Sequence, residues 1–353
     1  MATQSYWRSK GSFLKSGRDT NAGRDMTDKP VETARRHGRP LPPHPRERHR
    51  PLPGHEPKSS QDDARALEAV QTILGDPSYR EADEDIEFLR LDATRGLRLQ
   101  LDYMKTESIL RAHDVAHTIV VFGGTRIVEP KAARREVQQW TEAAAANEAD
   151  PEIRRRLAIA RRVEAKSRYY DIARAFGRVV ATNGAKVTGG GLMIMTGGGP
   201  GIMEAANRGA HDVGAKSIGL NIRLPHEQFP NPYVTPALCF SFHYFAMRKL
   251  HFLMRARALV AFPGGYGTLD ELFEVLSLAQ TRKIKPVPVI LVGEAYWRRV
   301  FDAEFLVDEG VIDLEDRDLF WFAESADDIW GSILAWYEAS GSPLLPRATG
   351  KTL

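Results

Sequence analysis

The stretch LMIMTGGGPGIMEAAN (residues 192–207) joins an apolar run, a glycine corner and the start of a helix, and this order decides the fold. Short apolar runs closed by glycine suit buried parallel strands. Gly197, Gly198 and Gly199 permit backbone conformations closed to other residues and let a ligand approach the main chain. Pro200 suits a first helical turn, where its missing N–H costs nothing. The free N–H groups of such a helix start favour an anion.

The same order of apolar run, glycine corner and helix recurs on both sides of this stretch. HTIVVFGGTR (117–126) predicts a strand that ends at Gly123 and Gly124, and FPGGYGTLDELFE (262–274) repeats the corner and the helix. From Leu192 onward, strand-like and helix-like segments alternate. This alternation predicts an α/β fold, with a doubly wound, Rossmann-like parallel sheet covered by helices on both faces. Ligands of such sheets sit beyond the carboxyl ends of the strands, so the corners predict one phosphorylated ligand held between them.

Composition and pattern divide the chain into four expected regions. We expect a disordered, basic, Pro-rich tail (1–60), a helical segment (61–116), a Rossmann-like domain (117–340) with a helical insert (130–165), and a flexible C-terminus (341–353). The first 60 residues hold 13 Lys and Arg against 6 Asp and Glu. So few apolar residues cannot offset the entropy of ordering this tail.

The tail leaves alternatives open. Its first 18 residues faintly resemble a transit peptide, and a true start at Met26 is an equal alternative. The tail could also serve as an arm for nucleic acid or an acidic partner, although a solvated tail is favoured. The Arg-rich run RRRLAIARRVEAKSR (154–168) is interpreted as a solvated helix face, so we do not expect a nucleic-acid partner.

Cysteine, histidine and hydropathy patterns exclude several classes of protein. The single cysteine, Cys239, excludes a disulfide framework and fits a reducing compartment, so we expect a cytoplasmic protein. The sequence contains no run of eighteen or more apolar residues, so we expect no membrane span. His243 and His251 lack partners at metal-ligand spacing, so we expect no metal and interpret both as packing in the core or at its rim.

We call residues 197–201 the first glycine corner and residues 264–267 the second glycine corner. Neither of these two corners matches the common nucleotide fingerprints. Ile202 stands where the last glycine of G-x-G-x-x-G belongs, and neither corner ends in Gly-Lys-Ser/Thr. A dinucleotide-dependent dehydrogenase and a P-loop NTPase are therefore disfavoured. In the second corner, Thr268 and Glu271 fit a capping box, and spacing alone favours this capping role over a chemical role for Glu271. Arg248 and Lys249 could extend to solvent from an apolar helix or pair with an anionic ligand.

The motifs PGGYGTLDE, preceded by MRK, and TGGGPGIMEAANRGA resemble the LONELY GUY (LOG) phosphoribohydrolases, in particular their long bacterial relatives, often mislabelled lysine decarboxylases. The resemblance covers about 118–293 and implies that residues 117–340 form a nucleotide-binding catalytic domain. It implies hydrolysis of the N-glycosidic bond of AMP-like nucleoside 5′-monophosphates or cytokinin ribotides to free base and ribose 5-phosphate. It also implies no cofactor and a homodimer or larger homo-oligomer. No lysine stands in a context that suits pyridoxal phosphate, so we reject decarboxylation.

The resemblance makes Arg248 and Glu271 the essential pair. A carboxylate near the anomeric carbon would stabilise an oxocarbenium-like transition state, and Glu271, or secondly Asp270, would position water. Arg248 would neutralise phosphate or help the departing base. Phe245, Ala246 and Met247 depart from the short members' pattern, which leaves the preferred base open. The predicted phosphate- and ribose-binding residues are Gly123, Gly124, Gly197, Gly198, Gly199, Gly201, Glu204, Lys249, Gly264, Gly265, Gly267 and Thr268.

A second class of function fits the same motifs. A non-catalytic protein could bind or carry a nucleotide or a phosphorylated cofactor, because the fold is similar to that of the molybdenum cofactor carrier proteins. Phosphate binding alone requires no carboxylate, so the presence of both Arg248 and Glu271 favours hydrolysis.

Overall fold

The computed structural model describes residues 53–147, 149–187, 191–223 and 229–345. The chain divides into two compact units, residues 1–80 and 81–353. In the described part of the first unit, helix α1 (Ala66–Gly75) ends at Gly75, and the 3₁₀ turn η1 (Pro77–Tyr79) follows. Asp76 caps that turn by accepting a hydrogen bond from the Ser78 N–H. Most of the predicted disordered tail and of the predicted flexible C-terminus lie outside the described residues.

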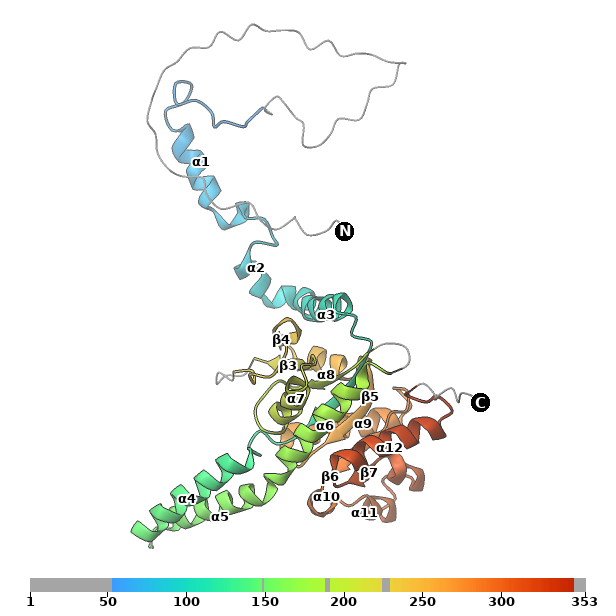
Figure 1. The fold of residues 1–353 in the computed structure, drawn as a ribbon. Helices are drawn as coiled ribbons and strands as arrows, with labels where there is room; N and C mark the ends of the chain where they lie inside the picture. The colour runs from blue at the N-terminus through green and yellow to red at the C-terminus, as the bar shows by residue number, and fades with distance from the viewer. Residues whose placement is uncertain (1–52, 148, 188–190, 224–228, 346–353) are drawn as a thin grey trace. The chain divides into compact units, whose positions relative to one another are not determined.

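The second unit is built on one seven-stranded sheet in which every neighbouring pair is parallel (Figure 1). The strand order is β4-β3-β2-β1-β5-β6-β7. The strands are β1 (His117–Phe122), β2 (Leu192–Thr196), β3 (Ile218–Ile222), β4 (Cys239–Phe242), β5 (Ala256–Ala261), β6 (Val289–Val292) and β7 (Trp321–Ala323). The predicted doubly wound parallel sheet is confirmed.

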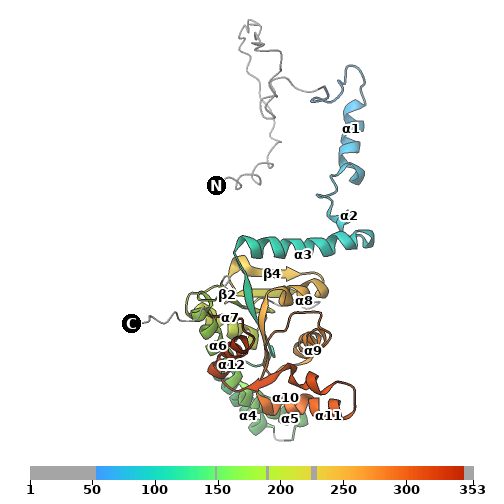
Figure 2. The ribbon, with the colours of Figure 1, turned by 90° about the vertical axis from the view of Figure 1, so that its right-hand side faces the viewer.

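Helices cover both faces of the sheet, as Figure 2 shows. Alternate residues of the central strand β1 enter different cores: Ile119 and Val121 pack on one face, Val120 and Phe122 on the other. The first face is covered by α6 (Arg168–Gly184), α7 (Ile202–Asp212) and α12 (Ala326–Ala339). The second is covered by α3 (Arg95–Ala112), α8 (Phe245–Met254), α9 (Tyr266–Gln280) and α10 (Glu294–Val300). Within the described ranges, no helix is both long and apolar enough to cross a bilayer.

The charged segment between β1 and α6 forms a helical hairpin of α4 (Pro130–Ala146) and α5 (Pro151–Lys166), which pack side by side (Figure 1). Asp150 ends the connection, because its carboxylate accepts hydrogen bonds from the Glu152 and Ile153 N–H groups at the start of α5. The C-terminal end of α5 returns to the sheet, directly before α6.

The structure adds three details to the expected outline of the chain. Strand β4 is a short edge strand that follows the 3₁₀ turn η3 (Pro236–Leu238). The expected helical segment (61–116) is interrupted, and its later part divides into α2 (Ile86–Arg90), the 3₁₀ turn η2 (Asp92–Thr94) and α3. After α10, Asp302 caps a further helix, α11 (Ala303–Asp308), which precedes the 3₁₀ helix η4 (Leu314–Leu319).

The strand order reverses at the centre of the sheet. From β1 the chain moves outward through β2 and β3 to β4, then crosses back to β5 on the other side of β1. The carboxyl ends of β1 and β5 therefore form a switch point, where open α/β sheets bind ligands. The glycine corners after β1, β2 and β5 all lie at this edge.

Candidate active site

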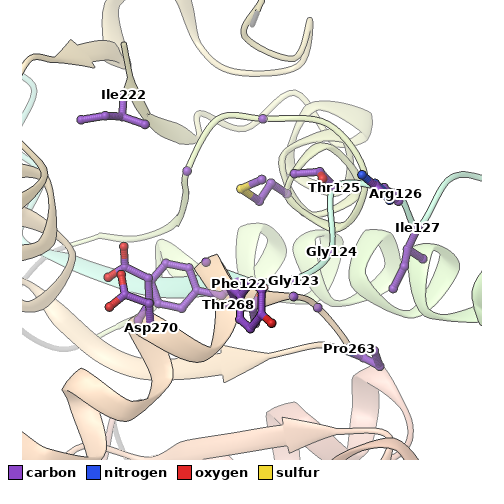
Figure 3. A pocket seen from close by; sticks show the side chains of 18 of the residues that line it. Phe122, Gly123, Gly124, Thr125, Arg126, Ile127, Ile222, Pro263, Thr268 and Asp270 are labelled. Atoms are coloured by element: carbon purple, nitrogen blue, oxygen red, sulfur yellow. The ribbon is translucent and has the colours of Figure 1, made fainter. Parts of the chain in front are cut away.

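A cavity of about 750 Å³ lies at the switch point (Figure 3). Its size is within the range of small-molecule sites. The structure brings most of the predicted site residues together, and those that line the cavity are Gly123, Gly124, Gly197, Gly199, Arg248, Gly264, Gly265, Gly267, Thr268 and Glu271. The predicted residues outside its lining are Gly198, Gly201, Glu204 and Lys249.

Backbone hydrogen bonds tie the three glycine corners to one another. The Gly124 N–H donates to the Pro263 carbonyl at 2.9 Å, and the Ile202 N–H donates to the Gly124 carbonyl at 3.3 Å. A Cβ atom at Gly123 would lie 2.6 Å from Ile202, so the isoleucine packs where a dinucleotide fingerprint has its third glycine. The corner after β1 is therefore locked between the other two corners.

Buried polar side chains hold the first corner from beneath. The Gly198 N–H donates to Thr196 Oγ1 at 2.9 Å, and Thr196 Oγ1 donates to Asn207 Oδ1 at 2.7 Å. The Asn231 side chain donates to the Gly199 carbonyl at 3.0 Å, and its N–H donates to the Gly198 carbonyl at 2.8 Å. Asn207 and Asn231 are buried. The corner is thus fixed in place, and Asn231 escaped the sequence analysis because it lies in a distant loop.

Helix α9 begins earlier than the predicted capping box implies, because that box would make Thr268 the N-cap. Gly265 is the N-cap, and the Thr268 N–H donates to the Gly265 carbonyl at 3.0 Å. Thr268 therefore lies inside the first turn, and the predicted capping role of Thr268 and Glu271 is wrong. The first N–H groups of a helix have no intrahelical partner. Here they belong to a segment that lines the cavity, so the start of α9 can bind an anion there.

Arg248 and Glu271 both line the cavity and form an ion pair. Arg248 Nη1 lies 3.7 Å from Glu271 Oε1, and the side chains are 13% and 8% exposed. Arg248 Nε donates to the Leu220 carbonyl at 2.7 Å, and the guanidinium lies 5.1 Å from the centre of the Phe252 ring. A Cβ atom at Gly197 would lie 2.5 Å from Arg248 Nη2, so the glycine leaves room for the guanidinium beside the first corner.

Burial raises the pKa of Glu271 to about 7, although the positive charges of Arg248 and Lys249 oppose this shift. Burial also lowers the pKa of Arg248, against the attraction of Glu271 and Asp270. A carboxyl whose pKa lies near neutrality is typical of an acid–base or charge-stabilising group in an active site.

The predicted residues outside the cavity lining have other partners. Lys249 forms ion pairs with Asp270 and Glu274, each at 2.9 Å, and Asp270 in turn lines the cavity. Glu204 accepts a hydrogen bond from Tyr170 Oη at 2.7 Å. Gly198 and Gly201 shape the first corner instead, with φ angles of 70° and 73°.

The two histidines that were interpreted as packing residues differ from each other. His251 is fully buried, and its ring stacks on Tyr103 at a centroid distance of 5.3 Å. His243 is exposed. In the part of the chain that the structure describes, no cluster of three or more His, Cys, Asp or Glu is placed to hold a metal.

The cavity also has a lining that the sequence analysis missed. Asn221 and Ile222 end strand β3, and Tyr296 donates a hydrogen bond to the Gly264 carbonyl. Asn221 could have been found from the sequence, because it lies at the carboxyl end of a strand. Nothing in the sequence pattern indicates Lys166, which reaches the cavity only because α5 returns to the sheet.

Comparison with known proteins places the chain in a family. A family model described as "Possible lysine decarboxylase" matches residues 203–333. A cytokinin riboside 5′-monophosphate phosphoribohydrolase of Arabidopsis thaliana is 30% identical over 168 residues, which are 46% of this chain and 74% of that protein. The chain belongs to the LOG family. The resemblance seen in the sequence is therefore confirmed.

Other similarities to the LOG-family chain are partial. A probable cytokinin riboside 5′-monophosphate phosphoribohydrolase of Oryza sativa subsp. japonica is 30% identical over 140 residues, 39% of this chain and 60% of that relative. The solved molybdenum cofactor binding protein of Rippkaea orientalis has 20% identity and a TM-score of 0.35, over 62% of this chain and 96% of that protein. The family model includes Arg248 and Glu271, whereas the first glycine corner precedes it.

Proposed function

We propose that this LOG-family protein is a phosphoribohydrolase of nucleoside 5′-monophosphates. Water cleaves the N-glycosidic bond, and the products are a free base and ribose 5-phosphate. One observation carries the proposal: Glu271, buried and one helical turn beyond the second glycine corner, lies 3.7 Å from Arg248 at the same cavity. A site that only bound phosphate would gain nothing from a buried carboxylate, because like charges repel.

The cavity supplies a place for each part of the substrate. The glycine corners and the start of α9 offer backbone N–H groups to the 5′-phosphate. Glu271 then faces the ribose. Ile222 and Phe245 offer apolar and aromatic surface for the base, near Arg248. In Figure 3, Ile222 and Asp270 both lie to the left of Gly123 and Gly124.

The chemistry follows from this placement. Positive charge develops on the ribose ring as the bond to the base breaks, and the ionised Glu271 stabilises it. Glu271 also positions the attacking water, whose oxygen bonds to the anomeric carbon while a proton passes to the departing base. Arg248 keeps part of the Glu271 population ionised, because its charge lowers the carboxyl pKa.

Product analysis tests the proposal. The purified protein is incubated with AMP, GMP, CMP, UMP, IMP and a cytokinin ribotide, and free base and ribose 5-phosphate are measured in parallel. We expect base release from at least one of them, reduced roughly 10²-fold or more by Glu271→Gln, the scale of a lost catalytic group. Glu274→Gln is the matched control, because Glu274 lies on the same helix but outside the cavity lining.

Two results would contradict the proposal. Tight nucleotide binding without base release from any monophosphate would indicate a binding or carrier protein. An equal loss of activity in both glutamine variants would show that helix α9, rather than the Glu271 carboxylate, had been disturbed. Thermal melting of each variant separates lost chemistry from lost structure.

A further inference from the structure

Helix α8 carries Arg248, yet its start has no capping side chain of its own. The N-cap is Tyr244, which makes no side-chain capping hydrogen bond within the described ranges. The helix begins at Phe245, which lines the cavity, and Arg248 follows three residues later. The first N–H groups of a helix need partners from outside it. The position of Arg248 therefore depends on whatever holds this helix start.

Asp102, on the sequence-distant helix α3, holds the start of α8. Its Oδ2 atom accepts hydrogen bonds from the His243 and Tyr244 N–H groups, each at 2.9 Å. The Tyr244 carbonyl in turn accepts a hydrogen bond from the Arg248 N–H at 3.3 Å. Arg98, also on α3, donates from Nε to Tyr244 Oη at 3.0 Å. Tyr244 thus connects the Asp102 carboxylate to the backbone of Arg248, and the helix dipole favours a carboxylate at this end.

The other end of α8 is fastened to the same helix, which lies beside it (Figure 2). The buried His251 ring stacks on Tyr103 at a centroid distance of 5.3 Å. Arg255, the C-cap of α8, donates two hydrogen bonds of 2.9 Å to the carboxylate of Glu107, and both side chains are mostly buried. Helix α3 therefore supports α8 at both ends, although none of its residues belongs to the described cavity lining.

We propose that Asp102 is a positioning residue, which fixes the start of α8 and thereby places the Arg248 guanidinium beside Glu271. The inference rests on the proposed function, since that function gives the Arg248–Glu271 pair its role. Without the Asp102 carboxylate, two N–H groups at the start of α8 lose their acceptor, and the turn that carries Arg248 loosens. A misplacement of about 1 Å at a reacting group can cost roughly 10²-fold in rate. Helix α3 thus serves the proposed reaction from outside the cavity.

A double-mutant cycle separates positioning from a purely structural role. We expect Asp102→Ala to lower kcat/KM at pH 7 roughly 10-fold on the monophosphate that the unmodified protein cleaves best. In an Arg248→Met background, the same replacement should change kcat/KM by less than about 2-fold, because no guanidinium remains to be displaced. If Asp102 only stabilises the fold, kcat/KM falls by the same factor in both backgrounds.

The pH–rate profile supplies a second readout, which a loss of stability alone does not move. The Arg248 charge lowers the Glu271 pKa, so displacing the guanidinium should move the midpoint of the profile upward in Asp102→Ala. Asp102→Asn keeps an oxygen acceptor, so its midpoint should not move and its kcat/KM should stay within about 3-fold of the unmodified protein. The other charges that act on the Glu271 carboxyl are left unchanged by these variants and belong to Lys249, Glu274 and Asp270.

Asp302→Ala is the matched control, because Asp302 likewise accepts two backbone hydrogen bonds at the start of a helix, α11, outside the described cavity lining. Both alanine variants should melt earlier, and only Asp102→Ala should lose activity. An equal loss of activity in Asp302→Ala, an equal factor in both Arg248 backgrounds or an unmoved midpoint would overturn the proposal.

The outcome for Asp102 stays distinct from the outcome for the proposed function. If the unmodified protein releases no base from any monophosphate, the proposed function fails, and melting tests the positioning alone. A Glu271 pKa raised further above its unfolded value of 4.5 costs more stability once pH exceeds it. The increase in melting temperature that Glu271→Gln brings should therefore grow more between pH 5 and pH 8 in the Asp102→Ala background. Equal growth in both backgrounds would overturn the positioning role.

Discussion

The first and second glycine corners share a pattern in sequence but differ in what lies behind them. Behind the first corner, neutral side chains such as Asn207 and Asn231 hold the loop through hydrogen bonds. Behind the second, the buried carboxyl of Glu271 has a pKa near 7. The neutral support suits a rigid cradle for an anion, and the buried acid suits chemistry on the group attached to that anion. Under the proposed function, both corners bind the phosphate, and the second corner also supplies the catalytic acid.

Replacing Arg248 is expected to have the largest effect, because this residue links the two corners. Its guanidinium lies beside Gly197 and pairs with Glu271. In Arg248→Met, the Glu271 pKa should rise above 7, since the Arg248 charge lowers it. We expect kcat/KM at pH 7 to fall roughly 10²-fold, the scale of a lost charge-stabilising group. Steady-state kinetics on the preferred monophosphate would measure this fall.

Arg248→Lys is the control for that experiment. It keeps a positive charge near Glu271 but loses the planar group that reaches the Leu220 carbonyl. Activity of Arg248→Lys between that of the unmodified protein and that of Arg248→Met would show that both the charge and the geometry of the guanidinium contribute. Unchanged activity in the methionine variant, with normal melting, would show that the link between the corners has no catalytic importance.

The pH dependence of activity tests the role of Glu271, the buried acid of the second corner. If the ionised Glu271 is the active form, kcat/KM rises with pH and levels off above its pKa of about 7. Below that pKa, each pH unit should reduce the rate about tenfold, following the ionised fraction. The profile of Glu271→Gln should lack this limb. A profile that falls as pH rises through 7 would instead make the protonated acid the active form.

Stability should change with pH in the opposite direction. The folded-state pKa of Glu271 is raised from 4.5 to about 7, so the folded protein binds this proton more tightly than the unfolded chain. This contribution to stability is fully present below pH 4.5 and is lost as pH rises through 7. The melting temperature of Glu271→Gln minus that of the unmodified protein should therefore be larger at pH 8 than at pH 5.

Backbone strain introduced into the first corner should weaken substrate binding more than it slows the chemical step. Gly198 has a φ of 70°, and a Cβ atom there would lie 2.0 Å from Asn221 Oδ1. Gly198→Ala should cost about 1–3 kcal/mol of stability and displace the loop, raising KM more than it lowers kcat. Gly310→Ala is the control, because Gly310 has a similar φ of 68° with nothing within 4 Å. Equal effects on KM in both variants would argue against a binding role for the corner.

The sequence predicts the fold and the corners because both depend on local patterns. Apolar runs, glycines and helix starts are adjacent in the chain, so the parallel sheet and most of the cavity lining could be predicted. Asn231 and Lys166 could not, because each reaches its corner or cavity from a separate loop or helix. The start of α9 was misjudged since Thr268 and Glu271 have capping-box spacing, whereas Gly265 and Tyr266 begin the helix without a capping side chain among the described residues.

Replacing Lys249 is expected to have the smallest effect on activity. This variant tests whether the substrate site at the second corner extends to Lys249. Sequence reasoning placed it on the substrate, but Lys249 lies outside the cavity lining, and its ammonium pairs with Glu274 and with Asp270, which does line the cavity. Partly exposed ion pairs contribute at most about 1 kcal/mol each, so Lys249→Met should melt slightly earlier and keep a nearly unchanged KM. Its charge also lowers the Glu271 pKa, so its loss should move the midpoint of the pH–rate profile upward. A large rise in KM with an unmoved midpoint would instead place Lys249 on the substrate.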